Sequence, residues 1–64
     1  MKIVLNGEAR NVAATTLAAL LVECDLTGKV ATAINEEFVP AGLRAARELT
    51  EGDRVEVLAP MQGG

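Results

Sequence analysis

The sequence predicts an α+β fold in which one main helix packs on one face of a mixed sheet of four to five strands. Two patterns indicate it: β-rich segments lie near both ends of the chain, and a single apolar stripe with helical spacing lies between them. The length of 64 residues allows one small domain. We expect this domain to comprise residues 1–59 and to be followed by a flexible C-terminal tail, residues 60–64.

Residues 2–5 and 8–12 are predicted to form a β-hairpin. Asn6-Gly7 between them is a strong two-residue turn signal, because both residue types tolerate the positive φ of a type I′ turn. Ala9 and Val12 do not share a parity along the second strand. We therefore expect a bulge or an early exit near its end.

The main helix is predicted from an apolar face with i, i+3, i+4 and i+7 spacing. Its residues are Leu17, Leu20, Leu21 and Cys24. Thr15 or Thr16 is suited to cap the N-terminus, and the helix is expected to end near Gly28. Cys24, on the same face, is expected to behave as a small buried hydrophobe.

The second half of the chain predicts further strands with little helix. Residues 30–34 are expected to form a buried strand, and residues 38–39 a short extended piece that Pro40 ends. Residues 41–49 are expected to form a loop with at most one turn of helix. Residues 54–58 alternate as a strand whose two valines face the core.

Composition argues against several functional classes. The net charge is −3, Phe38 is the one aromatic residue, and histidine is absent. An acidic chain with one stacking side chain is unsuited to nucleic acid, and lack of histidine removes the commonest general base. No nucleotide-binding, metal-ligand or nucleophile–base pattern is present. We expect neither an enzyme nor a metal site, and no bound cofactor.

The same composition predicts where the protein resides. The longest uncharged run, residues 11–22, is shorter than the ~20 residues that span a bilayer. Cys24 has no second cysteine with which to form an internal disulfide. We expect a cytoplasmic protein without a membrane partner.

The terminal pair Gly63-Gly64 points to chemistry at the end of the chain. Without Cβ atoms, an extended tail fits a narrow slot and presents the Gly64 α-carboxyl to another protein. That carboxylate is a poor electrophile until it is activated, for example by joining it to AMP. The required ATP and Mg²⁺ would be held by a partner enzyme.

Four residues are predicted to form the partner-binding tail. They are Leu58, Met61, Gln62 and Gly63. Leu58 and Met61 lead apolar surface toward the end of the chain, although Leu58 alternatively belongs to the core.

Three segments in order resemble the thiamine-biosynthesis sulfur carrier family: residues 33–40, residues 49–57 and the terminal Gly-Gly. The resemblance implies the β-grasp fold of ubiquitin, with the last strand parallel to the first in the middle of the sheet. It implies that Gly64 is adenylated by an enzyme related to ubiquitin-activating enzymes and converted to a thiocarboxylate. Sulfur would come from a cysteine-desulfurase relay and pass to thiazole synthase.

Alternative functions remain open from the residues alone. The small sulfur-carrier subunit of molybdopterin synthase shares the diglycine end and the adenylation, but members of that family are usually longer. Another sulfur-carrier pathway, a modifier joined to lysines, and a noncovalent ubiquitin-like interaction module are further alternatives. Loss or retention of function after removal of the two glycines separates the carriers from the noncovalent module.

Overall fold

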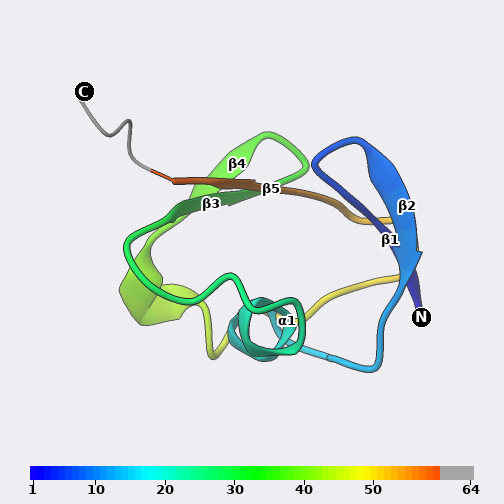
Figure 1. The fold of residues 1–64 in the computed structure, drawn as a ribbon, viewed down its shortest axis with the longest axis horizontal. Coiled ribbons are helices and arrows are strands. Elements are labelled where there is room, and N and C mark those ends of the chain that lie inside the picture. Colours follow the sequence, from blue (N-terminus) through cyan, green and yellow to red (C-terminus); the bar gives the residue numbers. More distant parts are fainter. Residues whose placement is uncertain (60–64) are drawn as a thin grey trace.

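The computed structural model describes residues 1–59, which form one five-stranded sheet and one α-helix (Figure 1). The elements are β1 (Lys2–Leu5), β2 (Glu8–Asn11), α1 (Leu17–Glu23), β3 (Ala31–Ile34), β4 (Glu37–Val39), the 3₁₀ helix η1 (Ala41–Leu43) and β5 (Arg54–Leu58). The strand order is β2-β1-β5-β3-β4, with β5 parallel to β1 and antiparallel to β3. This confirms the predicted α+β architecture, including the central position of the last strand. The predicted tail, residues 60–64, lies outside the described residues.

The first hairpin has the predicted turn. Asn6 and Gly7 both have positive φ, +48° and +84°, as a type I′ turn requires. β2 pairs with β1 residue for residue and ends at Asn11, one residue earlier than expected. Of the two expected irregularities, the early exit occurs, and it turns Val12 into the core.

Helix α1 begins as predicted but ends before Gly28. Thr16 is the N-cap, and its Oγ1 accepts a hydrogen bond from the Ala19 N–H. The helix ends at Glu23 because Asp25 adopts a left-handed φ of +57° and the Leu26 N–H turns back to the Leu21 carbonyl. The local sequence does not mark this stop, because the left-handed position holds aspartate rather than glycine.

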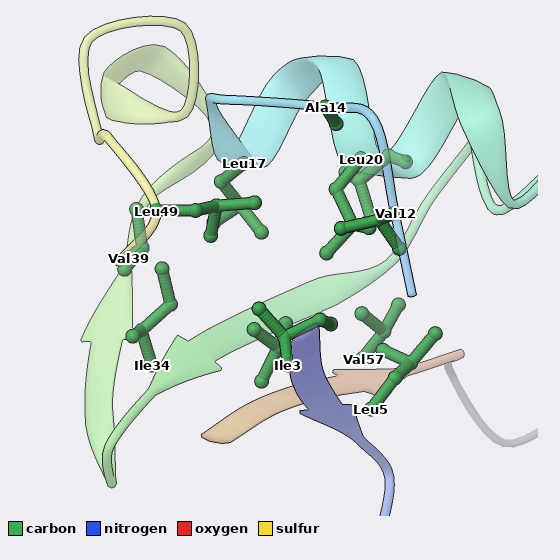
Figure 2. Close-up of a cluster of buried hydrophobic side chains, with 12 residues drawn as sticks. Ile3, Leu5, Val12, Ala14, Leu17, Leu20, Ile34, Val39, Leu49 and Val57 are labelled. Carbon is green, nitrogen blue, oxygen red and sulfur yellow. The ribbon is translucent and has the colours of Figure 1, made fainter. Parts of the chain in front are cut away.

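The core lies between α1 and the sheet, as Figure 2 shows. Its buried hydrophobic residues are Ile3, Leu5, Val12, Ala14, Leu17, Leu20, Leu21, Ile34, Val39, Leu49, Val55 and Val57. The two valines of β5 face inward as predicted. Cys24 is half-buried at the margin of this core rather than fully enclosed.

The segment between β4 and β5 contains only the short η1, as expected. Arg44, which follows η1, donates from Nε to Thr32 Oγ1 (3.0 Å) and from Nη2 to the Val30 carbonyl. These bonds join the segment to β3 and to Val30, the residue just before β3. The third strand begins at Ala31, so Val30 lies just outside it. β4 begins at Glu37, one residue before the predicted extended piece.

Candidate functional site

The central strand β5 leads the chain toward its C-terminus. It lies between β1 and β3, so both of its edges have a neighbouring strand. Val55 pairs with Leu5 on one side, while Val57 and Leu58 lie opposite Thr32 and Ala31 on the other. A strand held on both sides is a rigid base from which to present a terminal segment.

The start of β5 is held by a polar pair, the buried Asp53 and the exposed Asn35. Asp53 is 7% exposed, and its carboxylate accepts hydrogen bonds from the Thr50 N–H (2.8 Å) and from Asn35 Nδ2 (3.0 Å). Asn35 Oδ1 in turn accepts a bond from the Arg54 N–H (3.0 Å). The turn signal in residues 51–53 is visible in the sequence, but the burial of Asp53 is not.

The end of β5 is held by Asn6. Its Oδ1 accepts from the Val57 N–H (2.9 Å), and its Nδ2 donates to the Val57 carbonyl (3.2 Å). The sequence marks Asn6 only as a turn residue, because its second role depends on a contact between residues 51 positions apart.

Leu58 lies on the outer face of the sheet, away from α1. It is 65% exposed, which decides between the two interpretations of this residue in favour of the surface. The strand register places Ala31 opposite Leu58 and Ala33 opposite Phe38 on this face. We call these four residues the outer-face patch.

The outer-face patch has an aromatic anchor and a shallow floor. Phe38 is 65% exposed, and the two alanines between Phe38 and Leu58 leave a hollow of about 140 Å³ bordered by Glu56. Ligand pockets usually have roughly 300–1,000 Å³, so the hollow suits one side chain of a protein partner better than a small molecule. A second hollow, lined in part by Lys29, Leu58 and Ala59, adjoins the end of the described chain.

The predicted site residues are only partly covered by the structure. Gly64, Gly63, Gln62 and Met61 lie outside residues 1–59, and Leu58 is the one that the structure places. Within residues 1–59, no three His, Cys, Asp or Glu side chains gather in a way that could hold a metal ion. The same residues contain no helix with the length and apolar character that crossing a membrane requires.

Comparison with known proteins identifies the family. A model of the ThiS family matches residues 3–64, which include both terminal glycines. The chain belongs to the ThiS family. The crystal structure of the thiamine biosynthesis protein ThiS from Geobacter metallireducens has a TM-score of 0.86 and 26% identity to this ThiS-family chain, and the match covers all of both chains. An NMR structure of a thiamine biosynthesis protein from the same organism has a TM-score of 0.81 and 26% identity, covering this chain fully and 88% of the other.

A longer curated relative is also similar. A protein of Paramagnetospirillum magneticum named thiazole synthase is 42% identical over 66 residues. The match covers all of this ThiS-family chain but 20% of the relative, so the chain spans about a fifth of that protein's length.

The family match confirms the resemblance noted in the sequence. ThiS proteins are ubiquitin-like sulfur carriers of thiamine biosynthesis, and the match favours this family over the molybdopterin carriers. The five-stranded sheet with β5 between β1 and β3 is the β-grasp arrangement that the resemblance implied.

Proposed function

We propose that this chain carries sulfur for thiazole formation as a thiocarboxylate on Gly64 and is itself not an enzyme. The observation that carries the proposal is the family match, which extends through Gly64. The geometry supports it, because β5 is held on both sides and ends at Leu58, close to the terminus. Residues 59–64 span at most roughly 20 Å when extended, enough to place the carboxyl away from the folded body.

The proposed chemistry has three steps, and partner enzymes perform the first two. In the first, the Gly64 carboxylate attacks the α-phosphorus of ATP, and pyrophosphate leaves to give an acyl-adenylate. In the second, a sulfur nucleophile from a cysteine-desulfurase relay attacks the acyl carbon and AMP leaves. Cleavage of the bond between the transferred sulfur and its donor, by a thiol reductant, leaves the thiocarboxylate. ATP and Mg²⁺ belong to the adenylating enzyme, and this chain contributes its terminal carboxyl.

The proposed recipient of the sulfur is thiazole synthase. A relative named thiazole synthase contains a stretch 42% identical to this chain, which supports a working partnership between the two kinds of protein.

We place the partner-docking surface on the outer-face patch together with the tail residues Met61, Gln62 and Gly63. The exposed Phe38 is an aromatic anchor of the kind that dominates protein interfaces. Glu56 beside it favours a partner with basic side chains around an apolar hollow. We place the protein in the cytoplasm.

Intact-protein mass spectrometry tests the proposal. After incubation with the adenylating enzyme, ATP, Mg²⁺ and a sulfur source, the chain should gain the mass difference between one sulfur and one oxygen. The matched control is a chain lacking Gly64, which should stay folded and unmodified. An unchanged mass at an intact C-terminus, under conditions in which a known ThiS protein is converted, would refute the proposal.

Deletion of both terminal glycines separates a carrier from a noncovalent interaction module. A carrier should lose all sulfur transfer while keeping its fold. If the deleted chain supports thiazole formation as well as the full chain does, the noncovalent alternative is correct.

A further inference from the structure

Asn6 has two roles in the fold, and only one of them belongs to the hairpin. Its φ of +48° serves the turn between β1 and β2, a role that glycine would also fill. Its carboxamide extends to β5 and bonds both backbone polar groups of Val57. The turn does not require these bonds, so they call for a separate explanation.

The carboxamide of Asn6 continues the ladder between β1 and β5 after the β1 main chain has turned away. Along β5, every second carbonyl group faces β1, beginning with that of Asp53, the residue just before the strand. Asp53 accepts from the Val4 N–H (2.9 Å), and Val55 accepts from the Asn6 N–H (2.8 Å). Val57 is the next in this series, and its partner is Asn6 Nδ2. A carboxamide has the donor and acceptor of a peptide group, so it replaces the missing main-chain partner.

This replacement acts at the point where the chain leaves the sheet. Val57 is followed by Leu58, the last residue of β5, and β3 holds the opposite side through Ala31 and Thr32. Without Asn6, the last residues of β5 would be held from β3 alone. We infer that Asn6 is a positioning residue of the carrier, which fixes the direction in which β5 delivers the chain toward Gly64. The inference rests on the proposed function insofar as Gly64 is the group to be delivered.

Asn35 provides a matched control within the same chain. It also has a positive φ, +52°, in a turn between two strands, and its side chain also bonds β5. Its bonds go to Asp53 and Arg54 at the start of the strand, away from the exit. Replacement of either asparagine by glycine keeps the turn and removes only the side-chain hydrogen bonds.

The test compares Asn6→Gly with Asn35→Gly. All measurements are made at a temperature below the melting transition of both variants, so that both are folded. The first readout is adenylation, followed as pyrophosphate release with the activating enzyme. Asn6→Gly should lower kcat about three- to tenfold, as the loss of one to two hydrogen bonds permits, with KM within about twofold because the outer-face patch is unchanged. Asn35→Gly should leave both constants within about twofold of the unmodified chain.

The second readout is amide hydrogen exchange, which does not depend on any partner. Asn6→Gly should speed exchange at Val57, and Asn35→Gly should speed it at Arg54 instead. Equal losses of kcat in the two variants, or an unchanged kcat or an unchanged Val57 exchange rate in Asn6→Gly, would overturn the inference. If the unmodified chain is not adenylated at all, the proposed function fails, and the Val57 exchange rate alone decides whether Asn6 holds the strand end.

Discussion

The two faces of the sheet differ in what their side chains contact. The inner face bears fully buried residues such as Ile3 and Ile34, which pack under α1 (Figure 2). The outer face has small side chains at Ala31 and Ala33. Phe38 and Leu58, two large apolar side chains on this face, are both mostly exposed, so their contact with water adds no hydrophobic stabilisation to the fold. The difference indicates that the inner face maintains the fold, whereas the outer face is available to partners.

The largest effect should come from the inner face. Leu20 is fully buried on α1, so Leu20→Ala should cost about 2–5 kcal/mol in the free energy of unfolding by losing apolar contacts and leaving a cavity. In a domain this small, that cost is comparable with the total stability. Denaturant unfolding measures it, with Val22→Ala as the control, because Val22 is 70% exposed on the same helix. Equal losses in the two variants would contradict the assignment of the core.

The next effect should come from the polar pair at the start of β5. Asp53→Ala should cost about 1–3 kcal/mol in stability, because it leaves the Thr50 N–H and Asn35 Nδ2 without their acceptor. Thermal melting measures the change. Glu56→Ala is the control, since Glu56 lies on the exposed outer face; surface changes of this kind stay within about 0.5 kcal/mol. A melting temperature as high for Asp53→Ala as for that control would show that the buried carboxylate does not hold the strand.

A substitution in the outer-face patch should weaken partner binding and have little effect on folding. Phe38→Ala should weaken the complex with the adenylating enzyme or thiazole synthase by about 1–2 kcal/mol, as for an aromatic interface anchor. Its effect on unfolding should stay near 0.5 kcal/mol, because the side chain is exposed. Isothermal titration with each partner measures the affinity. Unchanged affinity for both partners would place the docking surface elsewhere.

The smallest effect on stability should come from the end of the chain. Removal of Gly64 should leave the melting temperature unchanged within about 1 °C, because the core and the sheet that the structure describes are built from residues 1–59. Thermal melting of the two chains side by side measures it. A clear drop in the melting temperature would show that the terminus is part of the folded domain and would weaken the separation of fold from function.

Local patterns predicted most of this fold, and long-range contacts account for what they missed. The Asn6-Gly7 turn and the stripe from Leu17 to Leu21 depend on neighbouring residues, so both are visible in the sequence. The Asn6–Val57 and Arg44–Thr32 bonds join segments far apart, and no local spacing marks them. The early end of α1 was missed because an aspartate adopts the left-handed conformation that glycine usually supplies.

The candidate site was predictable to a different extent. The terminal Gly-Gly is plain in the sequence, and the family match extends over it. The outer-face patch required the register of three strands, because it joins Phe38 on β4 to Leu58 on β5 across the alanines of β3. Alternation within one strand predicts which side chains share a face, but not which exposed residues of other strands lie beside them.

Sulfur transfer from labelled cysteine is the most direct test of whether Gly64 carries the sulfur. The complete system would receive cysteine that contains a heavy sulfur isotope, and the C-terminal peptide of the chain would be fragmented by mass spectrometry. If Gly64 carries the sulfur, the heavy isotope should appear first in the fragment that contains Gly64 and then in the thiazole product. Labelled thiazole formed at the same rate by a chain that lacks Gly64, or formed without label ever reaching Gly64, would contradict it.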